Sequence, residues 1–255
     1  MNKFPNLEHL IATIATLRSE NGCAWDREQT HASLRPNMIE EAYEAIDAIN
    51  ENNPAHLREE LGDVLLQVLL HSQIAAEEGD FDIEDVAKEL DEKLIRRHPH
   101  VFGTVKVNGT DDILANWDKI KKIEKPERTS VLSGITKSQS ALMSAQKISK
   151  KAVKVGFEWE TDDQLDECIL SEFREFKEAK TKEEKEEEFG DILFATVNLA
   201  RRNKIDAEQA LIKANTKFVK RFQKMEKLAE KPLEELTFDE WDALWKRAKQ
   251  LTAKA

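Results

Sequence analysis

Apolar residues recur every three or four positions over most of the chain, which is the spacing of one face of an α-helix. One stripe runs from Phe4 to Leu17, a second from Leu61 to Leu69 and a third from Phe189 to Ala200. Alternation of apolar and polar residues, the mark of a strand, is nearly absent, and the one short candidate, residues 100–109 (HVFGTVKVNG), is interpreted as a loop. The pattern therefore predicts an all-α protein.

The composition agrees with long helices. Of the 255 residues, 40% are hydrophobic and 35% charged, with only 8 Gly and 6 Pro, so helix breakers are scarce and the outer faces are solvated. The formal net charge of -11 argues against a nucleic-acid binder, because attraction to the phosphate backbone requires a basic surface. It does not exclude a phosphate ligand that is held through divalent cations.

The cysteines and the lengths of the apolar runs indicate the cellular compartment of the protein. Cys23 and Cys168 have no C-x-x-C partner, so a disulfide framework or a zinc cluster is not expected and a reducing cytoplasm fits better. The first apolar stretch contains Glu8 and His9, which argues against a secretory signal. The longest apolar runs are far short of a membrane span. We expect a cytoplasmic protein that does not contact a membrane.

The chain contains an internal repeat. Residues 125–140 lack helical periodicity and carry Pro126 and Gly134, which is typical of a linker. On its two sides, EELGDVLLQVLLH (59–71) matches EEFGDILFATVNL (187–199), and three further blocks match in the same order at similar offsets. The sequence therefore predicts two copies of one helical domain, at residues 1–124 and 141–255.

Acidic pairs recur at matching places in the two copies. Each pair is three residues apart, so both carboxylates share one face of a helix. In a chain this acidic, a single pair is most simply a solvated helix face, but packing alone does not explain why acids recur in both copies. The pairs are Glu41 with Glu44 and Glu60 with Asp63 in the first copy, and Glu172 with Glu175 and Glu188 with Asp191 in the second.

If each pair of acidic helices packs antiparallel, four carboxylates converge in each copy. Like charges beside a dry core are unfavourable unless they are protonated or bind a cation. Oxygen ligands without nearby His or Cys favour Mg²⁺, with Mn²⁺ as the alternative. A di-iron site would need Glu-x-x-His on two helices, and the only instance is Glu28 with His31. Gly62 and Gly190 stand in mid-helix beside the acids, which predicts that something approaches the backbone closely there.

Basic and aromatic residues also recur. A lysine and an arginine four residues apart share a helical face in each copy and are suited to phosphate oxygens, although a basic outer face is the simpler reading. A tryptophan is followed four residues later by a lysine in each copy, and a nucleoside could stack on the ring if it is not core. These residues are Lys93, Arg97, Trp117 and Lys121 in the first copy, and Lys217, Arg221, Trp245 and Lys249 in the second.

Together these motifs resemble the MazG family of nucleoside triphosphate pyrophosphohydrolases. The acidic pairs of the first copy are preceded by CAWDREQTHASL and followed by RRHPHVFG, and AQKISKKAVKVGFEW at 145–159 resembles the start of the family's second copy. The likeness covers nearly the whole chain, whereas no Walker A loop or G-x-G-x-x-G motif is present. The resemblance implies tandem all-α domains whose four-helix-bundle core is completed by dimerisation, and hence a homodimer.

The resemblance also implies Mg²⁺-dependent hydrolysis of nucleoside triphosphates, over a broad range of bases, to nucleoside monophosphate and pyrophosphate. It assigns catalysis and metal binding to the second copy, with the acids of the first copy as counterpart ligands. The family pattern opens with two adjacent acids, kept as Glu40 and Glu41 in the first copy, whereas Ser171 precedes Glu172 in the second. The implied metal ligands are Glu172, Glu175, Glu188, Asp191, Glu41, Glu44, Glu60 and Asp63; the implied substrate-binding residues are Glu187, Lys217, Arg221, Trp245, Lys249, Lys93 and Arg97.

Two other functions remain open on the sequence. A non-enzymatic helical module would bind a partner through its acidic faces and would release no pyrophosphate. A hydrolase for another phosphoanhydride, such as a modified nucleotide or phosphoribosyl-ATP, would share the same acids and differ only in substrate. Release of pyrophosphate with and without Mg²⁺ separates the first alternative, and a panel of substrates separates the second.

Overall fold

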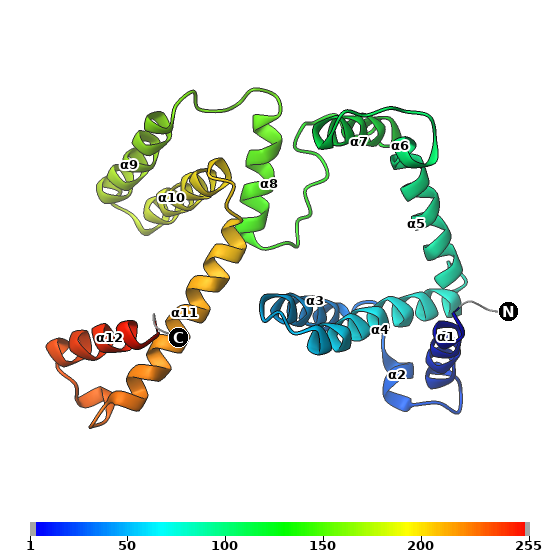
Figure 1. Ribbon diagram of the computed structural model, residues 1–255, viewed down its shortest axis with the longest axis horizontal. Helices are drawn as coiled ribbons and strands as arrows, with labels where there is room; N and C mark the ends of the chain where they lie inside the picture. Colours follow the sequence, from blue (N-terminus) through cyan, green and yellow to red (C-terminus); the bar gives the residue numbers. More distant parts are fainter. Residues whose placement is uncertain (1–3, 253–255) are drawn as a thin grey trace. The chain divides into compact units, whose positions relative to one another are not determined.

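The computed structural model describes residues 4–252, and this part of the chain contains helices and no β-strand (Figure 1). The all-α prediction is confirmed. The chain divides into two compact units, Met1–Glu124 and Lys125–Ala255, each of which is described by itself below. No described helix is long and apolar enough to cross a bilayer.

The first unit is built around a pair of long helices. Its helices are α1 (Pro5–Arg18), α2 (Ala24–Glu28), α3 (Arg35–Asn50), α4 (Pro54–Glu78), α5 (Ile83–Arg97), α6 (Pro99–Phe102) and α7 (Thr110–Glu124). Helices α3 and α4 lie side by side, joined by three residues, while α5 leads away from them toward α6 and α7 (Figure 1). The expected loop at 100–109 is thus partly wrong, since its first residues belong to α6.

Local signals fix the ends of α4. The side chain of Asn53 caps its first turn by accepting hydrogen bonds from the backbone N–H groups of Ala55 and His56, and Pro54 takes the first helical position. Gly79 ends the helix in the left-handed conformation, with φ of 79°, which glycine adopts without a steric penalty. Asn53 and Pro54 thus set where the turn between α3 and α4 ends, and Gly79 sets where α4 itself ends.

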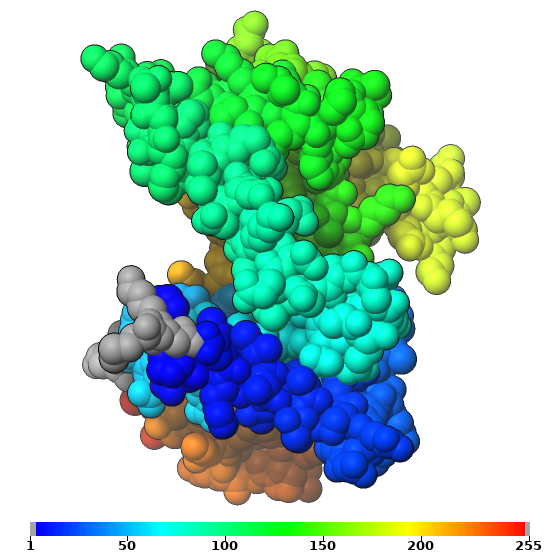
Figure 2. Space-filling view, turned by 90° about the vertical axis from the view of Figure 1, so that its right-hand side faces the viewer, coloured from blue at the N-terminus to red at the C-terminus, as the bar shows by residue number. Residues whose placement is uncertain are grey.

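The core of the first unit joins α1 to α4. Ile14 of α1 packs with Leu34, which precedes α3, and with three residues of α4, namely Leu69, Leu70 and Ile74. Figure 2 shows the surface of α1 as the dark blue ridge of this unit.

An ion pair reinforces the packing of α1 on α4. The guanidinium of Arg18 donates to the carboxylate of Glu77, with 2.8 Å between Nη2 and Oε2, and also to the backbone carbonyls of Asp26 and Gln29. The hydrogen bonds from Arg18 lower the pKa of Glu77. Arg18 therefore connects α1, α2 and α4.

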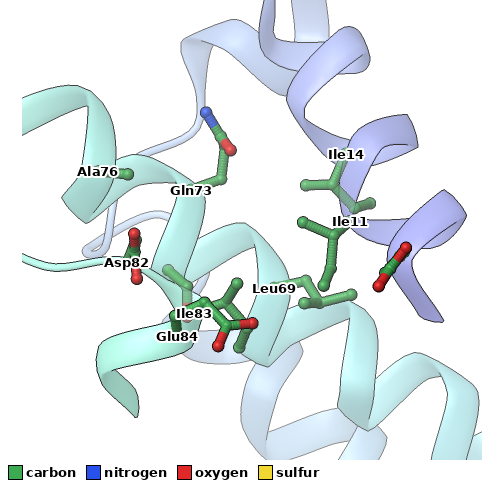
Figure 3. Close-up of a pocket in the computed structure, with 10 residues that line it drawn as sticks. Ile11, Ile14, Leu69, Gln73, Ala76, Asp82, Ile83 and Glu84 are labelled. Carbon is green, nitrogen blue, oxygen red and sulfur yellow. The ribbon is translucent and has the colours of Figure 1, made fainter. Parts of the chain in front are cut away.

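A cavity of about 430 Å³ opens where α1, α4 and the start of α5 meet (Figure 3). Its floor is apolar, with Ile11 and Leu69 in view, and Asp82 and Glu84 stand at its rim. Asp82 caps α5 in a reciprocal pair of side-chain-to-backbone hydrogen bonds with Asp85, so that carboxylate already has a structural role.

The second unit repeats the long helix pair. Its helices are α8 (Ala141–Val153), α9 (Asp162–Glu178), α10 (Lys182–Arg202), α11 (Ala207–Leu228), the 3₁₀ turn η1 (Leu233–Glu235) and α12 (Phe238–Thr252). Residues 125–140, the predicted linker, form no helix. Thr161 and Thr181 begin α9 and α10 with capping boxes. Helix α8 packs on α10, and α12 packs on α11 (Figure 1).

Candidate active site

Three carboxylates of the first unit converge across the α3–α4 pair. Glu41 projects from α3, and Glu60 and Asp63 project from α4, each with a carboxylate oxygen within 4.8 Å of the others. Glu60 is buried, with 7% of its surface exposed. The three-residue turn capped by Asn53 holds the two helices in the register that brings these acids together. We refer to these residues as the first acid triplet.

The second unit builds the same arrangement from α9 and α10. Glu172 projects from α9, and Glu188 and Asp191 from α10, again with oxygens within 4.8 Å of one another. The turn between these helices also spans three residues, and Thr181 caps its end. We refer to these residues as the second acid triplet.

The fourth predicted acid of each unit lies outside its triplet. Glu44 and Glu175 stay close enough for their charges to raise the pKa of a triplet member, Glu60 and Glu188 respectively. Glu175 accepts a hydrogen bond of 2.7 Å from Ser171, the residue that stands where the first unit has Glu40. The structure thus brings together three of the four predicted acids in each unit, with the fourth beside them.

The electrostatics of both triplets favour a cation. Burial is the largest cause that raises the pKa of Glu41, Glu60, Glu172 and Glu188, and the neighbouring acids add to it by repulsion. The donor atoms are all carboxylate oxygens, the set that hard divalent cations prefer. Their mutual spacing also suits one ion shared by three ligands, so the residues fit a divalent metal.

The triplets differ in the groups that contact them. In the first unit, Nε2 of His56 lies 3.0 Å from Oε1 of Glu60, and the hydrogen bond of His56 to Glu51 is the main cause that raises the pKa of this histidine. In the second unit, the Sγ atom of Cys168 donates to Glu172 at 3.8 Å, and burial followed by the charge of Glu172 raises the pKa of the thiol.

Sequence reasoning missed both of these neighbours. From the sequence, Cys168 is notable only because no second cysteine stands at C-x-x-C spacing. It lies four residues before Glu172, and His56 lies four residues before Glu60, so both spacings place the side chains on one helical face. That spacing was the signal that could have found them.

One predicted cation of the first unit, Arg97, is paired with an acid outside the triplet. Arg97 donates to Glu124 of α7, with 2.6 Å between Nη2 and Oε2, and Arg96 donates to the other oxygen of Glu124 at 2.7 Å. These hydrogen bonds, from Arg97 first and Arg96 second, lower the pKa of Glu124 to about 2. Lys93 is half-buried on the same helix.

The predicted cations of the second unit have fewer partners. Lys217 is exposed on α11, and the Nε atom of Arg221 is buried without a hydrogen-bond partner. The ring of Trp245 packs against Phe218, with centroids 5.2 Å apart, while Glu187 and Lys249 are exposed. Among residues 4–252, no hydrogen bond or ion pair joins these cations to the second acid triplet, and Figure 1 shows α11 extending away from α9 and α10.

Gly62 and Gly190 face open space. A Cβ atom added to either would meet no atom within 4 Å, and neither glycine has a positive φ. Neither the packing nor the backbone of the described chain therefore requires glycine at these positions. The expectation that a ligand or a second chain approaches the backbone here stays a prediction.

The fold and the triplets define an all-α protein with two carboxylate sites that fit a divalent metal. A family model, the MazG nucleotide pyrophosphohydrolase domain, matches residues 29–102, which run from the segment before α3 to the end of α6. Relatives match over nearly the whole chain, and on this basis the chain belongs to the MazG family.

Three relatives illustrate the match. A nucleoside triphosphate pyrophosphohydrolase/pyrophosphatase MazG of Thermotoga maritima is 50% identical over 246 residues, covering 95% of each chain. A nucleoside triphosphate pyrophosphohydrolase of Escherichia coli K12 is 42% identical over 255 residues, covering 96% of this chain and 97% of the relative. An uncharacterized protein of Bacillus subtilis, YabN, is 49% identical over 245 residues, covering 93% of this chain and 50% of its own length.

Proposed function

We propose that this protein hydrolyses nucleoside triphosphates to nucleoside monophosphate and pyrophosphate, with Mg²⁺ held by its acid triplets. The observation that carries the proposal is the recurrence of one all-oxygen triplet on two helix pairs. The names of the relatives from Thermotoga maritima and Escherichia coli support the reaction. Mn²⁺ is the expected substitute, since it accepts the same oxygen ligands.

In this proposal, Glu172, Glu188 and Asp191 hold the metal. When bound, Mg²⁺ supplies a positive centre that neutralises phosphate charge and acidifies a coordinated water. Glu175 stands beside the triplet with its Oε1 atom bonded to Ser171, so it is placed to orient a water and accept its proton. Glu188 is the alternative base. Glu41, Glu44, Glu60 and Asp63 form the corresponding set of the first unit.

Basic residues on α11 are proposed to bind the phosphate chain. Lys217 offers a point charge, and Arg221 offers several N–H donors on one planar group, which suits the charge that develops on the leaving pyrophosphate. Trp245 is proposed to lie near the nucleoside, and Glu187 and Lys249 are proposed as further substrate-binding residues. In the first unit, Lys93 and Arg97 stand at the matching positions, where Arg97 is paired with Glu124.

We further propose that the protein is a cytoplasmic homodimer. Apolar side chains remain exposed on the helix pair of the second unit, among them Phe173, Phe189 and Leu193 at 45%, 50% and 46%. A second copy would bury these faces and complete a four-helix bundle. It would also be the means by which cations of α11 reach a triplet, because α11 leads away from the triplet of its own unit (Figure 1). The free cysteines, Cys23 and Cys168, agree with a reducing compartment.

The direct test measures pyrophosphate release from a panel of nucleoside triphosphates, with and without Mg²⁺. We expect Glu175→Gln to keep its fold by circular dichroism and to lose at least about 100-fold in turnover, because the carboxylate that accepts the proton is gone. Glu183→Gln, an exposed acid of the same unit, is the matched control and should behave as the parent. Equal turnover of the parent and Glu175→Gln would remove Glu175 from the mechanism, and a parent that releases no pyrophosphate from any substrate would contradict the proposed reaction.

A further inference from the structure

A glutamine in the first unit holds a buried acceptor that no group of the described chain satisfies. Gln67 of α4 is 4% exposed, and its Oε1 atom has no hydrogen-bond partner. Gln146 of α8 shows the ordinary arrangement, because it is similarly buried yet donates from Nε2 to the carbonyl of Ile205 at 2.7 Å and accepts at Oε1 from the N–H of Ala207 at 3.0 Å. A buried carbonyl without a donor destabilises the folded state, so Gln67 calls for an explanation.

The position of Gln67 on α4 indicates which group could donate to this oxygen. It follows Asp63 by four residues, so the two side chains lie one turn apart on the same face of α4. That face meets α3 at the first acid triplet, where Asp63 approaches Glu41. One turn further along, Leu70 packs in the same core cluster as Leu34, which precedes α3. Gln67 thus lies on the face of α4 that carries the first acid triplet, one turn beyond Asp63.

The second unit shows that packing does not require an amide here. At the matching position, four residues after Asp191, it has Ala195, which is 5% exposed. The same helix pair therefore forms around a small apolar residue. A polar side chain at this place is specific to the first unit, and so is the unsatisfied oxygen.

We propose that Oε1 of Gln67 accepts a hydrogen bond from the ligand that the first acid triplet binds, which makes Gln67 a ligand-binding residue of that site. The inference rests on the proposed function. The donor is an N–H or O–H group of the nucleotide, or a water that the divalent cation carries, and both present the same chemistry to a carboxamide oxygen. A buried oxygen without a donor carries a free-energy cost, and a bound ligand that donates to Gln67 relieves it.

The test uses the full chain with the second triplet disabled by Glu188→Gln and Asp191→Asn, so that binding reports on the first unit. Gln67→Met keeps the volume of the side chain and removes the orphan oxygen. Two quantities are measured: amide hydrogen exchange of α4 in metal-free buffer, and the Kd of a non-hydrolysable nucleoside triphosphate analogue with Mg²⁺, by calorimetry. Gln146→Met in the same background is the matched control.

We expect Gln67→Met to leave exchange in α4 unchanged or slower and to weaken binding of the analogue about tenfold, because one hydrogen bond to the ligand is lost. Gln146→Met should do the opposite, with faster exchange in the second unit and an unchanged Kd. Titration with Mn²⁺ alone identifies the donor: an equally weakened Kd for Mn²⁺ assigns it to a cation-bound water, and an unchanged one assigns it to the nucleotide.

Faster exchange of α4 in Gln67→Met, or an analogue Kd equal to that of the background, overturns the proposal and leaves Gln67 as the partner of a structural water. If Gln67→Met does not fold, Gln67→Ala, the residue of the second unit, is judged by its Kd alone. A background protein that binds neither analogue nor Mn²⁺ removes the proposed function of the first unit together with this inference. Nucleotide hydrolysis by the parent with an unchanged Kd in Gln67→Met removes only the role of Gln67.

Discussion

Each unit contains a carboxylate triplet, and the groups that surround the triplet differ between the two units. In the first, His56 contacts Glu60, and Arg97 is held by Glu124. In the second, Glu188 has no such histidine, since position 184 is a glutamate that caps its own helix, and the Nε atom of Arg221 lacks a partner. The comparison teaches that the acids alone do not define a working site. The arginines distinguish the units, because Arg97 is paired with Glu124 while the Nε atom of Arg221 lacks a partner, and on this ground we propose the second unit as the site of turnover.

The sharpest way to break this comparison is to neutralise one acid of each triplet. We expect Asp191→Asn to lower turnover at least about 100-fold, because a charged ligand of the metal is lost, and Asp63→Asn to lower it less than about threefold. Initial rates of pyrophosphate release at saturating Mg²⁺ measure both. Equal losses in the two variants would show that both units turn over, and a larger loss in Asp63→Asn would assign catalysis to the first unit.

The arginines provide the second contrast. We expect Arg221→Ala to lower kcat/KM by about 10-fold to 100-fold, because it removes donors proposed for the phosphate chain. Arg97→Ala should leave kcat/KM within about twofold and lower the melting temperature of the first unit, because Glu124 loses its main partner. Steady-state kinetics and calorimetry on both variants check this. A kinetic defect in Arg97→Ala without a change in stability would contradict the comparison.

The pH dependence of the first unit tests the structural role of Glu124. Its pKa is lowered from 4.5 to about 2 by Arg97 and Arg96, so its contribution to stability is present above pH 4.5 and is lost as the pH falls toward 2. We expect Glu124→Gln to cost about 1–2 kcal/mol at pH 7 and to approach the parent near pH 2. Calorimetry across this range measures the difference. A constant difference between the two proteins at every pH would exclude the ion pair as its cause.

A histidine pair supplies the smallest expected effect, again confined to the first unit. Nδ1 of His31 lies 2.6 Å from Nδ1 of His71, and burial together with His31 lowers the pKa of His71. The unfolded chain then binds more protons as the pH falls through about 6.5, so the pair weakens stability in that direction. Replacing His71 by leucine, the residue at position 199 of the second unit, should reduce this loss of stability between pH 8 and 6. Thermal melts at both values check the prediction, and an unchanged slope would contradict it.

Much of the fold could be predicted because the helices follow from the periodic spacing of apolar residues along the chain. The stripes around Leu65 and Leu193 gave the long helices, and i, i+3 spacing placed the acids on common faces. The register between two helices depends on how their side chains pack, and spacing within one helix does not contain that information. This is why Glu41 meets Asp63 while Glu44 lies outside the triplet, a distinction absent from the sequence pattern.

Ion pairs between helices that are distant in sequence could not be predicted either. Arg97 and Glu124 are 27 positions apart and lie on different helices, so no spacing within one helix predicts their ion pair. The turn at residues 100–109 was misjudged for a simpler reason. Pro99 stands at the first position of α6, which is a recognised signal for a helix start, and the apolar alternation after it concealed that signal.

The three-residue turns between the paired helices have a consequence for biosynthesis. Because each triplet is drawn from a single hairpin of about forty residues, its ligands meet through contacts that are close in sequence, and such contacts form early and quickly. During translation the first hairpin would be complete before the second unit has been synthesised. A nascent chain should therefore acquire the capacity to capture a divalent ion well before the enzyme is finished.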